Sequence, residues 1–205
     1  ASASLISRNS TFSDNHSSSD GGGVAHAGGV AHFNNVTVAY NTAGGNGGGL
    51  HFAGSGGFSI TNTIVADNDD TSHSPYRNGT ADCSGAFTSS GYNLIGDRAR
   101  ASNYPTTPDG CTLTTATGDT LGGVWLLTNY LTYYAGLGAL QTNGGTTLSR
   151  SPMASGSGMS VDHGSPNTPG SGGSSCEMFD QRSQLRPVDG GTDGIARCDR
   201  GAVEH

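Results

Sequence analysis

The chain contains no lysine, and its nine basic residues are all arginines. Charged residues make up only 12% of the sequence, and the formal net charge is −7 at pH 7. Nucleic acids and anionic membrane surfaces bind proteins through a concentrated basic surface. The composition therefore excludes both as expected partners.

Apolar residues are also scarce, at 32% of the chain, whereas glycine accounts for 35 of the 205 residues. Leu, Ile, Val and Phe are too few for a thick core of the ordinary globular kind. The longest apolar stretch, at residues 124–137, is interrupted by polar residues and too short to span a bilayer. A stable fold must then bury the same few positions repeatedly, which favours a repetitive architecture.

Four cysteines are present, and none has the close spacing that a zinc site usually needs. An even number of separated cysteines predicts disulfides in an oxidising compartment. Three pairings are possible. We favour Cys83 with Cys111 and Cys176 with Cys198, because each pair brackets one loop-rich segment.

A repeat organises the first seventy residues. The heptapeptides NSTFSDN, NVTVAYN and NTIVADN begin at Asn9, Asn35 and Asn62, so they lie 26 and 27 residues apart. A glycine triplet at 21–23 returns at 47–49, close to the same period. Apolar residues alternate within the units, as they do in strands. Short strands on this period predict an all-β fold, a right-handed parallel β-helix with coils of about 26 residues.

Stacking of the units would align equivalent positions. One apolar position of each heptapeptide would face inward and form a core column: Phe12, Val38 and Val65. The closing asparagines tolerate left-handed backbone and bond the backbone of a turn, so a structural ladder is expected at one corner. Its members would be Asn15, Asn41 and Asn68. We assign residues 1–80 to β-helix coils and 81–205 to late coils with long loops and a loop-rich, disulfide-closed C-terminal cap.

Scattered motifs in the second half carry a family resemblance. They are Asp82-Cys83, GYNLIGD at 91–97, NGGTT from Asn143, DQR at 180–182, Arg186-Pro187 and CDRGAVE at 198–204. With NTIVADN ahead of them, these motifs resemble the ending of bacterial β-helix proteins of the choice-of-anchor Q type. The preceding coils resemble the polymorphic outer-membrane-protein repeats that accompany that ending. Two positions depart from the family pattern: Ser183 replaces the usual glycine, and Arg200 replaces an apolar residue.

The resemblance implies a secreted or cell-surface bacterial protein, which in this family is commonly held by a separate C-terminal anchor. No anchor follows His205 in this sequence. Release, a lost tail or retention by assembly are then the expected alternatives.

Enzymes with this fold act on polysaccharides through clustered carboxylates and a basic residue. The coils offer one such group: Asp67, Asp69 and Asp70, with Arg77 nearby. Its neighbours are turn formers, so a solvated corner is the better interpretation. Asp162 and His163 beside several serines lack the GxSxG elbow of a nucleophile. We therefore predict no catalytic residues.

The loop DGGTDG at 189–194 partly resembles a calcium loop, with Asp189, Asp193 and Asp199 as candidate ligands. Gly191 stands where the middle acidic ligand would be, and a turn closed by Cys176 and Cys198 explains the same residues. We predict no cofactor, with calcium as the alternative.

An aromatic segment stands apart from the polar remainder: Trp125, Tyr130, Tyr133 and Tyr134. It could cover the last coil or form a subunit interface. Because the repeat begins near Ala1 with no capping element before it, the segment also predicts a head-to-tail homo-oligomer, and such contacts give filaments.

The expected function is that of a non-enzymatic extracellular structural or adhesive protein. Its expected partners are copies of itself or an extracellular glycan. The alternatives are a carbohydrate-active enzyme, either a polysaccharide lyase or a hydrolase, and a glycan-binding module without turnover.

Overall fold

The computed structural model describes residues 4–71, 82–98, 110–126, 129–131, 133–153, 159–191 and 193–205. The described chain contains strands and irregular segments and no α-helix. Its coils form a parallel β-solenoid of about four turns with about 26 residues in each coil. The predicted fold class is therefore confirmed.

The first three coils each combine a long strand with shorter ones. The first coil holds β1 (Ser4–Ser13), β2 (His16–Ser17) and β3 (Val24–His26). The second coil holds β4 (Gly29–Ala39), β5 (Thr42–Ala43) and β6 (Leu50–Phe52). The third coil holds β7 (Gly56–Thr61), β8 (Ile64–Ala66) and β9 (Asp69–Asp70).

The later coils are less regular. They contain β10 (Cys83–Gly91), β11 (Leu94–Ile95), β12 (Cys111–Thr114) and β13 (Thr120–Leu121). An antiparallel hairpin follows, made of β14 (Val124–Leu126) and β15 (Asn129–Leu131). The boundary that the sequence predicts near residue 81 falls outside the described residues.

Equivalent positions of successive coils lie in register. Phe12 pairs with Val38, Val38 with Val65, and Val65 with Ile95. Val38 and Val65 are fully buried, and Phe12 packs against the same cluster from a partly buried position. Aromatic rings fill the interior beside this column: Phe33, Phe52, Phe58 and Phe87. A core of repeated positions thus compensates for the low apolar content.

The glycine triplets lie where neighbouring coils come into close contact. A Cβ atom on Gly22 would lie 2.2 Å from the Gly48 carbonyl oxygen, and one on Gly48 would lie 2.5 Å from the Asp69 nitrogen. Only glycine leaves room for this approach.

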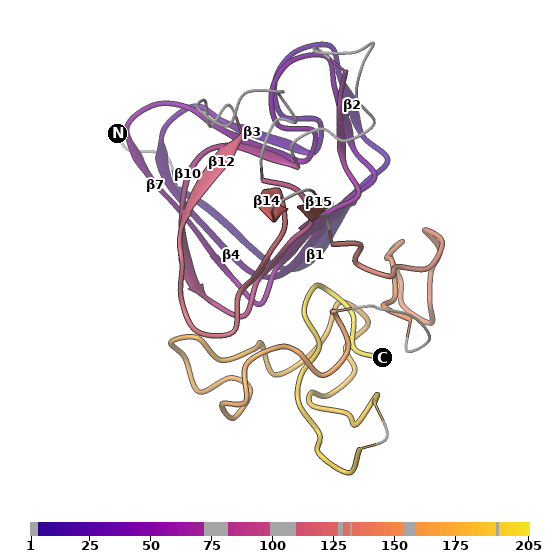
Figure 1. The fold of residues 1–205 in the computed structure, drawn as a ribbon. Coiled ribbons are helices and arrows are strands. Elements are labelled where there is room, and N and C mark those ends of the chain that lie inside the picture. The colour runs from indigo at the N-terminus through magenta and orange to yellow at the C-terminus, as the bar shows by residue number, and fades with distance from the viewer. Residues whose placement is uncertain are drawn as a thin grey trace.

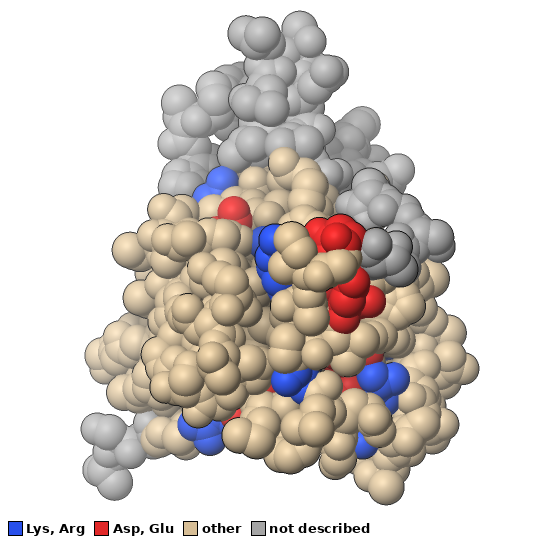
Figure 2. All heavy atoms as spheres, turned by 90° about the horizontal axis from the view of Figure 1, so that it is seen from below, with Lys and Arg blue, Asp and Glu red and all other residues tan. Residues whose placement is uncertain are grey.

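Seen along its axis, the solenoid has a three-sided outline (Figure 1). The chain from about residue 135 onward lies outside this outline, along the side that includes β1 and β4. We call residues 133–205 the C-terminal segment. Figure 2 views the molecule from the side of this segment and shows charged side chains in a few small groups among uncharged residues.

Candidate functional site

Both favoured disulfides are confirmed. Cys83 and Cys111 join the beginnings of β10 and β12, with their Cα atoms 5.2 Å apart. Cys176 and Cys198 join two parts of the C-terminal segment, with their Cα atoms 6.6 Å apart. Two buried disulfides indicate that the protein folds in an oxidising environment.

The structure places the predicted asparagines in one hydrogen-bonded ladder. The side-chain oxygen of Asn41 accepts hydrogen bonds from the backbone and side-chain nitrogens of Asn15, at 3.0 and 2.9 Å. Asn68 accepts the same pair of bonds from Asn41. Asp82 then accepts the same pair from Asn68 and so ends the ladder. Burial raises the pKa of Asp82 well above its ordinary value.

A second ladder follows another corner and also ends in an aspartate. The Asn93 side-chain oxygen accepts a bond from the Thr63 backbone nitrogen, and Asp119 accepts bonds from both nitrogens of Asn93. Asp119 also accepts bonds from Ser89 and Ala116, so both of its carboxylate oxygens are engaged. These carboxylates satisfy buried donors and therefore stabilise the coils.

Two further asparagines fasten the C-terminal segment to the side of the solenoid. The Asn35 side chain accepts a bond from the Glu177 nitrogen and donates to the carbonyl oxygens of Asp199 and Gly201. The Asn62 side chain accepts a bond from the Ser165 nitrogen and donates to the Ser174 carbonyl. Both residues adopt left-handed backbone at one corner, with φ of 51° and 47°.

The terminal motif residues form a buried network within the segment. Arg186 forms an ion pair with Glu204, and both side chains are almost fully buried. Glu204 also accepts bonds from the Val188 and Asp199 nitrogens. Asp180 pairs with Arg182 and accepts a bond from the Glu204 nitrogen. The motif therefore holds the segment together, and burial raises the pKa of Asp199 to about 7.

The two departures from the family pattern have distinct structural settings. Ser183 has a φ of 67°, a conformation that glycine adopts more readily than serine. Arg200 is buried and donates to the Gly118 and Met159 carbonyls and to the Thr120 hydroxyl. Burial lowers the pKa of Arg200 to about 10, so its guanidinium stays charged at neutral pH while joining a late coil to the segment.

The remaining charged candidates that the structure describes do not form one centre. Asp67 occupies a corner with a φ of 61°, and Asp69 and Asp70 form β9, which pairs with β5. Arg77, the basic residue predicted beside them, falls outside the described residues. Within the described ranges, no three His, Cys, Asp or Glu residues are placed to hold a metal ion.

The calcium-loop candidates have separate partners. The Asp189 carboxylate accepts a bond from the Gly194 nitrogen, and that of Asp193 accepts one from Ile195. Asp199 is buried and accepts bonds from the Asp162 and His205 nitrogens.

The aromatic segment divides between the hairpin and the C-terminal segment. Trp125 and Tyr130 are backbone partners across β14 and β15. Tyr133 packs against a cluster that includes Ile64 and Leu94. Tyr134 is 69% exposed. The two tyrosines thus have different surroundings, one against the coils and one in solvent.

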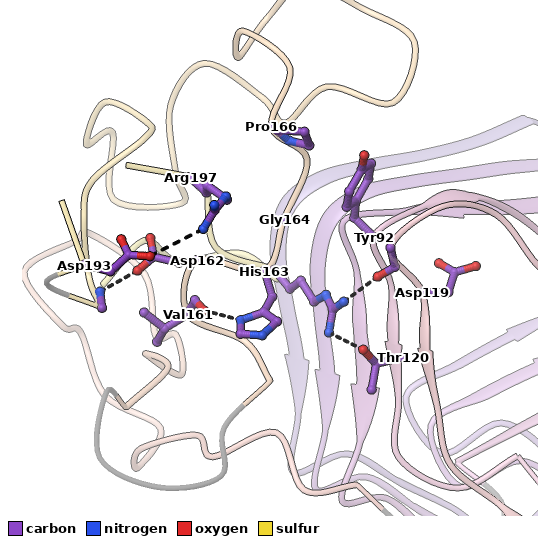
Figure 3. A pocket seen from close by; sticks show the side chains of 13 residues that line it. Tyr92, Asp119, Thr120, Val161, Asp162, His163, Gly164, Pro166, Asp193 and Arg197 are labelled. Atoms are coloured by element: carbon purple, nitrogen blue, oxygen red, sulfur yellow. Dashed lines mark hydrogen bonds and ion pairs between the residues drawn. The ribbon is translucent and has the colours of Figure 1, made fainter. Parts of the chain in front are cut away.

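A pocket of about 660 Å³ opens between the late coils and the C-terminal segment (Figure 3). We call it the junction pocket. Its lining includes Tyr92 and Thr120 from the coils, and Asp162, His163, Asp193 and Arg197 from the segment. Figure 3 shows Tyr92 on one side and Asp193 with Arg197 on the other, with His163 between them. The pocket thus brings together Asp162-His163 and part of the DGGTDG loop, which sequence reasoning considered separately.

Polar groups of the junction pocket are partly preorganised. Nδ1 of His163 lies 2.5 Å from the Val161 carbonyl oxygen, and Arg197 lies 3.7 Å from the Asp193 carboxylate. The Gly191 nitrogen donates to Asp162. This arrangement offers fixed hydrogen-bonding groups and an aromatic ring to a small polar ligand.

Sequence reasoning missed Tyr92. The repeat contains the signal, because residues 92–94 occupy the same coil positions as residues 62–64. Tyr92 therefore stands where Asn62 stands in the coil before.

Comparison with known proteins identifies one partial match. Residues 9–27 match the Chlamydia polymorphic membrane protein repeat, which covers the first coil from the middle of β1 through β3. No curated protein and no solved structure matches the chain. Among the described residues, no helix has the length and apolar character needed to cross a membrane.

Proposed function

We propose that the chain is a non-enzymatic protein of the bacterial cell exterior, a rigid β-solenoid that acts as a scaffold or adhesin. The observation that carries this proposal is the use of charged side chains that are buried or partly buried. Asp82, Asp119 and Asp199 accept backbone hydrogen bonds, while Arg186 and Arg200 bind carbonyl oxygens. Side chains of the types used in catalysis are thus engaged in holding coils and segment together.

Three further observations support an exterior location. The first coil matches a repeat of a polymorphic membrane protein. Both cysteine pairs are oxidised. The terminal motifs resemble those of secreted β-helix proteins of the choice-of-anchor Q type, in which the solenoid is displayed outside the cell.

The test combines adhesion with turnover. Beads coated with the protein are applied to cell and matrix surfaces, and the free protein is incubated with a panel of acidic and neutral polysaccharides. We expect adhesion above that of uncoated beads, without new reducing ends or unsaturated products. Product formation that disappears in a His163→Ala variant would instead establish an enzyme acting at the junction pocket.

We also propose that copies of the chain assemble head to tail. Strand β1 pairs with β4 along one edge, and its other edge has no partner strand among the described residues. Free strand edges can pair with another chain. Filaments in electron micrographs that are lost in a Tyr134→Ser variant would support assembly through that exposed side chain. Dispersed particles for the parent protein would exclude it.

A further inference from the structure

We propose that the junction pocket binds a neutral saccharide unit, with Tyr92 as the platform for one face of the sugar ring. The inference rests on the proposed adhesive function and names the ligand class of that function. One residue departs from the pattern of an otherwise regular corner of the solenoid.

The corner is a column of residues with left-handed backbone. Asn9, Asn35 and Asn62 have φ values of 46°, 51° and 47°, and the column continues through Tyr92 at 61° to Gly118 at 78°. Asparagine and glycine adopt this conformation readily, whereas a bulky aromatic residue does so at a cost in strain. Such strain is typical of functional positions.

The pocket opens at the coil where the column changes from asparagine to tyrosine. Asn35 and Asn62 bind the C-terminal segment through their amides. Tyrosine has no side-chain amide to bind the C-terminal segment, and beside Tyr92 that segment lines the pocket. Tyr40, a second tyrosine with left-handed backbone, has its ring covered by the Arg150 guanidinium at 4.0 Å. Tyr92 instead lines the pocket, and its ring lies against Gly118, where a Cβ atom would come within 2.3 Å of it.

The opposite wall supplies both donors and acceptors. A neutral His163 that donates from Nδ1 to the Val161 carbonyl leaves Nε2 as an acceptor. The Arg197 guanidinium donates, and the Asp193 carboxylate accepts; their side chains are 38% and 53% exposed. A sugar hydroxyl both donates and accepts hydrogen bonds, and the C–H groups of a sugar face suit the electron-rich face of an aromatic ring. The combination fits a saccharide.

Charge selects a neutral sugar over an acidic one. Asp162 and Asp193 line the pocket beside Arg197, so the cationic side chain is already opposed by carboxylates. The second lining guanidinium, on Arg200, donates to protein oxygens. The whole chain carries −7, which disfavours approach of a polyanion.

Calorimetric titration tests the inference. The probes are neutral oligomers of glucose, galactose, mannose and N-acetylglucosamine, with oligogalacturonate as the acidic probe. Tyr92→Asn removes the ring while placing in the column the residue found at Asn62, and His163→Ala removes the acceptor. We expect each to weaken binding of a neutral oligomer by about tenfold, which corresponds to about 1.4 kcal/mol. Phe179→Ser is the matched control, since it removes an exposed aromatic side chain that does not line the pocket.

Three results would overturn the inference: no binding of any neutral oligomer at millimolar concentration, preference for oligogalacturonate, or binding that survives both pocket variants in correctly folded protein. Adhesion without saccharide binding would remove this inference and leave the proposed function standing. Turnover of a bound neutral saccharide would leave this inference standing and exclude the proposed non-enzymatic function.

Discussion

Two carboxylates, one buried and one partly buried, take the place of amides at the ends of hydrogen-bonded ladders. Asp82 accepts from Asn68 the pair of bonds that Asn68 accepts from Asn41, and Asp119 accepts bonds from both nitrogens of Asn93. An asparagine at the end of the ladder would still need a partner for its amide group. In its ionised form a carboxylate only accepts hydrogen bonds, so it ends the series and leaves no donor unpaired.

Asp199 gives the molecule a pH-dependent stability. Its pKa is raised to about 7 by burial and by the nearby Glu204 carboxylate, against about 3.9 in an unfolded chain. The folded state therefore binds the proton more tightly, and the stabilising contribution is complete below the unfolded pKa and is lost as pH rises through about 7. We expect the free energy of unfolding to fall between about pH 4 and pH 7, the interval between the two pKa values.

Urea denaturation across this range, on the parent protein and Asp199→Asn, measures the effect. The variant should show a shallower fall because its side chain does not titrate. Asp67 and Asp82, whose pKa values are also raised by burial, should keep part of the slope. Equal slopes in the two proteins would contradict the assignment to Asp199.

At the scale of the strand, close contact between coils places strict demands on single glycines. Gly56 begins β7 with a φ of 124°, and a Cβ atom there would lie 1.8 Å from the Gly29 carbonyl oxygen. Gly57, the next residue, has no atom within 4 Å of the same position. Adjacent glycines thus have opposite tolerance for a side chain.

We therefore expect Gly56→Ala to lower the free energy of unfolding by about 3 kcal/mol or more, because both the backbone conformation and the contact become unfavourable. Gly57→Ala should change it by no more than about 0.5 kcal/mol. Chemical denaturation of the two variants provides the comparison. A similar loss in both would show that strand propensity, and not the coil contact, governs this site.

For the whole molecule, the sequence predicts the parts that repeat from coil to coil and not the parts that occur once. The strands of the first three coils follow from the repeat, because each coil meets the same neighbours in the same register, as Phe12, Val38 and Val65 do. The path of the C-terminal segment follows from single contacts. Asn62 binds Ser165 and Ser174, which lie 103 and 112 residues further along the chain. No periodic signal marks such contacts, so the junction pocket was not predicted, although the place of Tyr92 in the repeat could have been read from residues 92–94.

The disulfide of the C-terminal segment should control how firmly that segment holds to the solenoid. Replacing Cys176 and Cys198 by alanine opens a loop of 22 residues, which corresponds to about 3 kcal/mol in the chain-entropy model. We expect faster proteolysis within residues 159–205, with the β-sheet circular dichroism signal retained.

The matched control replaces Cys83 and Cys111 by alanine, because that disulfide joins two coils. It should weaken the solenoid itself and leave early cleavage of the C-terminal segment unchanged. Segment cleavage at the parental rate in the Cys176→Ala, Cys198→Ala protein would contradict the expected role of that disulfide.

The asparagine ladder also bears on how such a gene can change length. Each rung from Asn15 to Asn68 repeats one donor and acceptor pattern, at separations of 26 and 27 residues. Duplication or deletion of one such unit in the DNA would leave every amide with a partner. Duplication of the unit that contains Asp82 would instead place a carboxylate in the middle of the ladder. The side-chain oxygen of the next rung would then lack the amide donor that it bonds in the regular series. Insertions and losses of coils should therefore accumulate on the amino-terminal side of Asp82.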